Sequence, residues 1–80
     1  MNIQSISKEK SEAIVTLTSS ELVTLCNVLY EKTVGEDASN TALKLYADLM
    51  IARDLSQYGH IDAFCLECII KCRERINNKE

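Results

Sequence analysis

Two isolated glycines are the strongest helix-breaking residues in this chain, which contains no proline. Gly35 and Gly59 separate three segments whose apolar residues recur at the three- and four-residue spacing of amphipathic helices. The sequence therefore predicts a mainly α-helical fold, with helices over about 18–33, 37–58 and 61–77. Asp37 is the expected N-cap of the second helix, and Gly35 is expected to end the first in a left-handed conformation.

The N-terminal part of the chain has a different pattern. Residues 13–17, Ala-Ile-Val-Thr-Leu, are rich in β-branched side chains and predict a short strand. Residues 1–12 are polar and of mixed charge, and we expect a loosely ordered arm. Because a lone strand leaves its backbone groups unpaired, the strand must find a partner, either the same strand of another copy or a stretch of the arm. Residues 13–80 are expected to form a single domain.

The clearest local signal is a capping box at the start of the first helix. In Thr18-Ser19-Ser20-Glu21, Thr18 can accept a hydrogen bond from the Glu21 N–H, while the Glu21 carboxylate reaches back to the Thr18 N–H. The apolar stripe that follows predicts the buried face of this helix. Its members are Leu22, Leu25, Cys26 and Leu29.

The second and third helices are apolar on two sides. A seam of small and large residues predicts the main contact face of the second helix, and Ile51, Leu55 and Tyr58 form another stripe. The seam consists of Ala38, Ala42, Leu45, Leu49 and Ala52. The third helix has a main stripe of Ile61, Cys65, Cys68, Cys72 and Ile76, whereas Ala63, Leu66 and Ile70 face another way.

Two-sided apolar helices need cover on both sides, which three helices of one small chain do not supply. The sequence therefore predicts a homodimer, with a helical bundle formed by the second and third helices of two copies. A compact chain of 9.0 kDa is expected to expose about 4,900 Å².

Four cysteines form the only arrangement that resembles a chemical site. Cys65, Cys68 and Cys72 share one helical face, and Cys26 or His60 could complete four metal ligands. The three thiols lie within the most apolar stripe of their helix, and free cysteine packs as a small hydrophobic residue. We therefore predict core packing for these cysteines and no metal or other cofactor, with a thiolate metal site as the alternative.

Other chemistry is weakly indicated. His60 lies at the corner between the second and third helices, without a nucleophile or an orienting partner nearby in the sequence. Asp48, Arg53 and Asp54 are expected on the solvated side of their helix. No glycine-rich phosphate loop and no Ser/His/Asp set is discernible, so the chain is predicted not to be an enzyme.

Charge and hydropathy limit the partners. The net charge of -3 removes the usual attraction to nucleic acid. No apolar run is long enough to cross a membrane, and the first residues lack the pattern of a signal peptide. These features predict a cytoplasmic protein with no membrane partner.

The order of strand 14–17, capping box Thr18-Ser19-Ser20-Glu21, helix, Gly35 turn and second helix resembles the ribbon-helix-helix regulators. The resemblance covers about residues 13–55 and implies strands paired across a dimer, with outward side chains reading the major groove. Ile14, Val15, Thr16 and Leu17 include none of the Arg, Lys, Asn or Gln side chains that read base edges, and the third helix is an addition.

The preferred functional prediction is a small regulatory or accessory homodimer that binds another protein. A ribbon-helix-helix-like DNA regulator and a cysteine-ligated metal protein are the alternatives. The expected partner-binding residues are Ile51, Leu55, Tyr58, Leu66 and Ile70.

Overall fold

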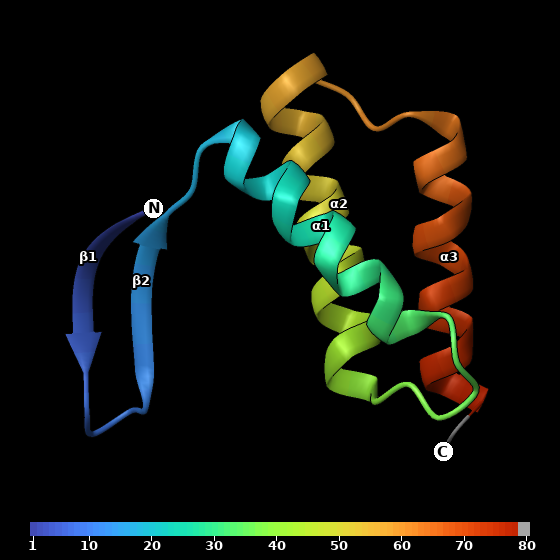
Figure 1. The fold of residues 1–80 in the computed structure, drawn as a ribbon, viewed down its shortest axis with the longest axis horizontal. Coiled ribbons are helices and arrows are strands. Elements are labelled where there is room, and N and C mark those ends of the chain that lie inside the picture. Colours follow the sequence, from blue (N-terminus) through green and yellow to red (C-terminus); the bar gives the residue numbers. More distant parts are fainter. Residues whose placement is uncertain (79–80) are drawn as a thin grey trace.

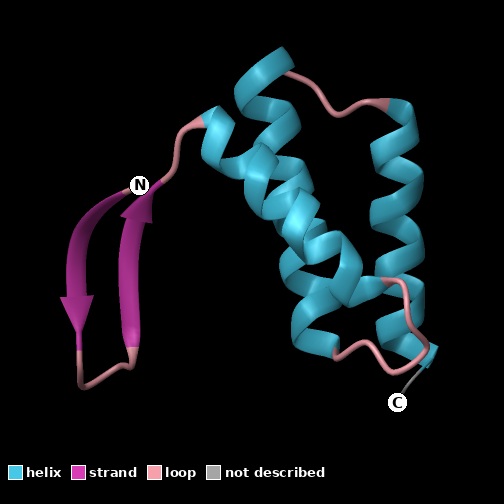
Figure 2. Ribbon diagram, in the orientation of Figure 1, coloured by secondary structure: helices cyan, strands magenta, loops and turns pink. Residues whose placement is uncertain are grey.

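The computed structural model describes residues 1–78 and is mainly helical. Two strands, β1 (Asn2–Ser7) and β2 (Glu12–Thr16), precede three helices, α1 (Ser19–Thr33), α2 (Asn40–Tyr58) and α3 (Ala63–Asn78). Figure 1 shows the strands as a hairpin standing apart from the helices, and Figure 2 shows the same division by secondary structure. The predicted class, a short N-terminal strand followed by three helices, is confirmed, with a second strand added.

The second strand comes from the segment expected to be a loose arm. Residues 2–7 pair with 12–16 in an antiparallel ladder, so β2 finds its partner within the same chain. The tight turn between them is closed by the Ser11 N–H, which donates to the Lys8 carbonyl at 3.3 Å. Ser11 takes a left-handed backbone conformation with φ of 55°. The polar stretch of residues 8–11, within the segment expected to be a loose arm, is therefore the turn between the two strands.

Helix α1 begins as predicted. Thr18 accepts a hydrogen bond from the Glu21 N–H at 3.2 Å, and its own N–H donates to the Glu21 carboxylate at 2.9 Å. Both halves of the capping box are thus formed, and Glu21 also contacts the N-terminal ammonium of Met1. Leu22 and Cys26 are buried on this helix, whereas Leu25 is 37% exposed.

Two helix boundaries differ from the prediction because other side chains provide the caps. The N-cap of α2 is Ser39, whose hydroxyl accepts from the Ala42 N–H at 3.0 Å, and not Asp37. Helix α3 begins two residues later than expected, and the Asp62 carboxylate just before it accepts from the Phe64 N–H at 3.1 Å. Ser and Asp at these positions satisfy amide groups that the first helical turn leaves free.

The two glycines behave differently. Gly59 adopts the left-handed conformation, with φ of 75°, and its N–H donates to the Leu55 carbonyl, which ends α2. The expectation for Gly35 is wrong, because among the described glycines only Gly59 has a positive φ and α1 ends at Val34 in a right-handed conformation. The Arg75 guanidinium of α3 instead donates to the carbonyls of Thr33 and Gly35, which holds this loop against α3.

Helix α2 is the centre of the helical unit, with α1 packed on it from one side and α3 from another (Figure 1). The seam predicted for α2 is only partly buried: Ala38 belongs to the core and Leu49 packs against it, but Leu45 is 46% exposed. The buried residues of α2 are Leu43, Ala47, Met50 and Asp54. Because α2 is apolar on more than one side, its neighbours and not its own periodicity select the buried face. The stripe of α3 is confirmed, with Ile69 and Cys72 buried and Ile61, Cys68 and Ile76 packed against the core.

Candidate functional site

Two places stand out among residues 1–78. One is a cluster at the junction of α2 and α3, formed by Arg53, Asp54, Asp62 and Cys65, which we call the polar corner. The other is one side of the hairpin.

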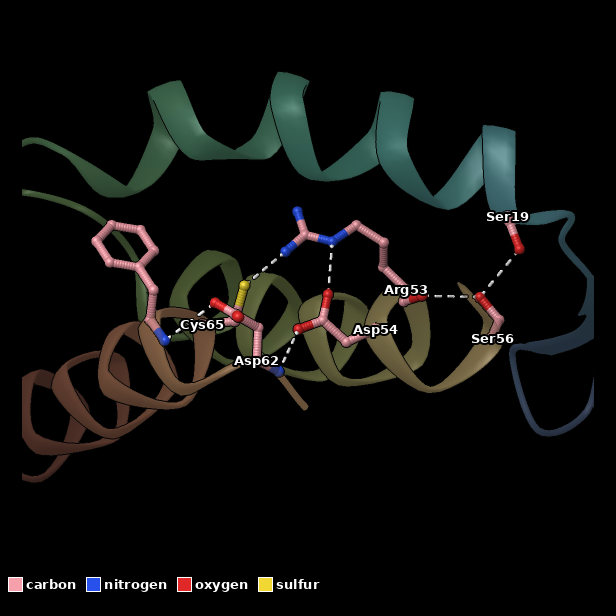
Figure 3. Close-up of polar contacts among 7 residues, drawn as sticks. Ser19, Arg53, Asp54, Ser56, Asp62 and Cys65 are labelled. Atoms are coloured by element: carbon pink, nitrogen blue, oxygen red, sulfur yellow. Dashed lines mark hydrogen bonds and ion pairs between the residues drawn. The ribbon is translucent and has the colours of Figure 1, made fainter. Parts of the chain in front are cut away.

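The polar corner is organised around a buried carboxylate. Asp54 is 1% exposed, so the prediction that it lies on the solvated side of its helix is wrong. One carboxylate oxygen accepts from Arg53 Nε at 3.1 Å, and the other accepts from the Asp62 N–H at 3.1 Å. Figure 3 shows Arg53 reaching across to Cys65, where Nη2 donates to Sγ at 2.9 Å. The corner thus joins the end of α2 to the start of α3.

The charges of the corner are fixed by these contacts. Burial alone would raise the pKa of Asp54, but hydrogen bonds from the Asp62 N–H, Cys65 and Arg53 bring it below its usual value. The carboxylate is therefore ionised at neutral pH and balances the Arg53 guanidinium. A buried charge held by a partner and several hydrogen bonds stabilises one arrangement of the two helices.

Cys65 is not prepared for nucleophilic chemistry. Burial raises the pKa of its thiol, its hydrogen bond to Asp54 raises it further, and the Arg53 charge only partly opposes them. A protonated thiol is a poor nucleophile and a poor metal ligand. The corner therefore fits a structural connection between helices better than a reactive site.

An open depression of about 560 Å³ lies beside the corner. Tyr58 and His60 line it together with Arg53, Asp54 and Cys65, and the Tyr58 and His60 rings lie 6.2 Å apart. His60 Nδ1 lies 3.1 Å from the Tyr58 carbonyl oxygen. Within the described residues, no hydrogen bond links His60 to a carboxylate or to a nucleophile, so this geometry does not assemble an acid–base pair.

The four cysteines are all free, and three of them lie in or against the helical core, whereas Cys65, also predicted to pack in the core, lies in the polar corner against Arg53. Cys26 and Cys72 are buried in the core cluster, and Cys68 packs against it. Burial raises the pKa of the Cys26 and Cys72 thiols, which keeps them protonated at neutral pH. No group of three or more potential ligands within residues 1–78 is arranged to hold a metal ion.

The residues predicted to bind a partner divide into two kinds. Ile51 is half-buried and packs against the core, so it serves the fold. The other four lie 46–62% exposed, as one pair on α2 and one on α3. We call these the helical apolar pairs: Leu55 with Tyr58, and Leu66 with Ile70. Each pair is separated by about one turn, so its members share a face.

The hairpin carries a second apolar surface, which sequence reasoning missed. In the ladder Ile3 pairs with Val15 and Ile6 pairs with Ala13, and directly opposed residues point to the same side of a sheet. Ala13 and Val15 also share a side, because side chains alternate along a strand. Ile3, Ile6, Ala13 and Val15 therefore make up one side of the hairpin, the apolar hairpin face.

A β-bulge makes this face possible. Ile3 and Ile6 are three residues apart, so in a regular strand they would point to opposite sides. The register shifts between Ile3 and Ser5, which leaves Gln4 as an extra residue. The Gln4 side-chain amide donates to the Thr16 hydroxyl. The β-branched residues of 13–17 indicated the strand, but nothing in the sequence indicated the bulge at Gln4, which brings Ile3 and Ile6 to one side.

Among residues 1–78, no helix combines the length and the hydropathy that crossing a bilayer requires. Comparisons of this chain with protein-family models, with curated proteins and with solved structures found no match. Function is therefore argued from the geometry alone.

Proposed function

We propose that this chain is a small non-enzymatic regulatory or accessory protein, which forms a homodimer and acts by binding another protein. The single observation that carries the proposal is the size of its surface. The chain exposes 5963 Å², roughly 1,000 Å² more than a compact protein of this mass is expected to expose.

The distribution of apolar side chains supports this reading of the surface. Among residues 1–78, fifteen large apolar side chains are exposed, whereas eight apolar residues are buried. Single exposed apolar residues are ordinary, but groups of them mark binding surfaces. Here seven of the fifteen lie on the apolar hairpin face and on the helical apolar pairs, and Phe64 of α3 is also 72% exposed.

The polar corner supports the non-enzymatic part of the proposal. Its ionised and hydrogen-bonding groups are directed at one another, and the Cys65 thiol is held in its protonated form. Such a corner contributes rigidity to the surface that the two helices present.

The oligomeric state is tested by sedimentation equilibrium of the full chain across the micromolar range. The proposal expects a dimer that dissociates on dilution. A monomer at every concentration would contradict the homodimer.

Binding of another protein is tested by affinity capture with the wild type and a Leu66→Asp/Ile70→Asp double variant. Both residues are about half exposed, so the variant is expected to retain the helical core. The control is Lys71→Asp, an exposed position on the same helix whose only ion pair is with Glu67 among the described residues. The proposal expects proteins that the wild type and the control retain and the double variant loses. If the wild type, the control and the double variant retain the same proteins equally, Leu66 and Ile70 of α3 are not part of the binding surface.

A further inference from the structure

The hairpin is the part of the molecule least supported by its own chain. Within residues 1–78 neither strand lies against a helix, and ten of the eleven strand residues are exposed, Ser7 being intermediate (Figure 1). A two-stranded hairpin is marginally stable in water unless one side is covered. A cover from outside the described residues would therefore stabilise this hairpin.

The apolar hairpin face has the shape and chemistry of one half of a sheet-on-sheet contact. Ile3 is 56% exposed, Ile6 73% and Val15 40%, and all four members of the face are uncharged. The opposite side contains mostly polar residues, with Ile14 as its large apolar residue. The bulge at Gln4 brings two isoleucines to one side, although no helix of residues 1–78 packs against the hairpin.

Charge favours a second copy as the cover. Residues 1–17 contain Lys8, Lys10, Glu9 and Glu12, so their side chains sum to zero. The net charge of -3 therefore lies entirely in the remainder of the chain. Two copies that meet through their hairpins bring together their neutral parts and keep the acidic parts outside, which avoids the repulsion between like-charged chains.

The available area also suits a dimer. The whole chain exposes roughly 1,000 Å² more than a compact chain of its mass, which leaves room for the ~800 Å² that each partner contributes to a standard stable interface, and the hairpin is the part that stands apart from the helices. A face that is apolar throughout is complementary to an identical face, as a two-fold interface requires.

We infer that a second copy of this chain covers the hairpin, with the apolar hairpin faces of the two copies packed against each other about a two-fold axis. This inference rests on the proposed homodimer and names its interface. The helical apolar pairs then remain free for a different protein.

The test compares Ile6→Asp with Ile14→Asp in the full chain. Both positions are exposed isoleucines in the hairpin, at 73% and 61%, but they point to opposite sides. The dimer dissociation constant, measured by sedimentation equilibrium, is expected to rise roughly 100-fold or more for Ile6→Asp, because each interface would bury an unpaired carboxylate in each copy. For Ile14→Asp the constant is expected to stay within about threefold of wild type.

Circular dichroism provides the folding control, since both variants should keep the helical signal of the wild type. Hydrogen exchange of the β1 and β2 amides should be slow in the wild-type dimer and fast in Ile6→Asp. A dimer that resists Ile6→Asp, or that both variants weaken equally, overturns the hairpin interface while leaving the homodimer intact. A wild-type chain that is monomeric throughout overturns the homodimer itself, and loss of helix in Ile6→Asp would show that the hairpin belongs to the helical core.

Discussion

The hairpin and the three-helix unit both gather apolar side chains on one side, but the two regions differ in whether other described residues cover that side. In the helical unit the apolar residues of α1, α2 and α3 converge, and Leu43, Met50 and Ile69 are at most 2% exposed. In the hairpin the apolar residues converge equally well on one side, but among the described residues nothing covers that side (Figure 2). The comparison shows that the spacing of apolar residues along the chain is enough to place them on one side of an element. The stability that they contribute depends on whether another element buries that side.

The polar groups of the two regions show the same contrast. The polar corner buries the Asp54 carboxylate and gives it hydrogen bonds from Arg53 Nε and from the Asp62 N–H. The side-chain contacts of the hairpin, such as that between Gln4 and Thr16, are exposed to water. Hydrogen bonds in water contribute little net stability, while a buried group that loses its partners is costly. The following experiments test this contrast, beginning with the largest effect.

Removing a core side chain from the helical unit should have the largest effect. Leu43 is 0% exposed, and Leu43→Ala is expected to lower the free energy of unfolding by about 2–5 kcal/mol, because it leaves a cavity at the centre of α2. Urea denaturation followed by circular dichroism measures this change. The matched control is Leu45→Ala on the same helix, where the side chain is 46% exposed and a loss below ~1 kcal/mol is expected. Equal losses would show that the two sides of α2 are equally buried in solution.

Neutralising the buried carboxylate should have the next largest effect. Asp54→Asn is expected to cost about 1–3 kcal/mol at neutral pH, because Arg53 loses its buried counter-charge. The control is Asp48→Asn on the same helix, whose ion pair with Lys44 is exposed, with an expected loss below ~0.5 kcal/mol.

The pH dependence of the unfolding free energy of wild type and Asp54→Asn provides a further test of the buried carboxylate. The pKa of Asp54 is lower in the folded chain than in the unfolded chain. The stabilisation is therefore complete above the unfolded pKa of about 4 and is lost as the pH falls through the lower, folded value. The stability difference between wild type and Asp54→Asn should narrow on acidification. A difference that stays constant down to the lowest folded pH would contradict the assignment of an ionised Asp54.

A substitution in the hairpin is expected to have the smallest effect on the stability of the helical unit. Ile3→Ser removes an apolar side chain that is 56% exposed and touches no helix, so the unfolding free energy of the helical unit should change by less than ~0.5 kcal/mol. The measurement must be made at a dilution where any dimer has dissociated, because association adds to the apparent stability. A loss as large as that of Leu43→Ala would mean that the two regions are one cooperative unit.

The sequence by itself determined the features that depend on neighbouring residues. The capping box at Thr18, the end of α2 at Gly59 and the apolar stripe of α3 follow from side-chain chemistry and spacing within one or two turns. Of the five partner-binding residues chosen from spacing, Ile51 packs against the core and Leu55, Tyr58, Leu66 and Ile70 are exposed, and their binding of a partner stays a prediction.

Tertiary structure decided which of several possible faces became the buried one. Along α2, Leu43, Ala47, Met50 and Asp54 follow the spacing of a helical stripe, and the Asp54 carboxylate is buried at its end because Arg53 and the Asp62 N–H satisfy it. The Arg75 contact with the loop after α1 and the bulge at Gln4 likewise join residues that are distant in the sequence or depend on strand register. Local spacing specifies an element and its apolar sides, whereas the choice among those sides depends on contacts between elements that no short stretch of sequence contains.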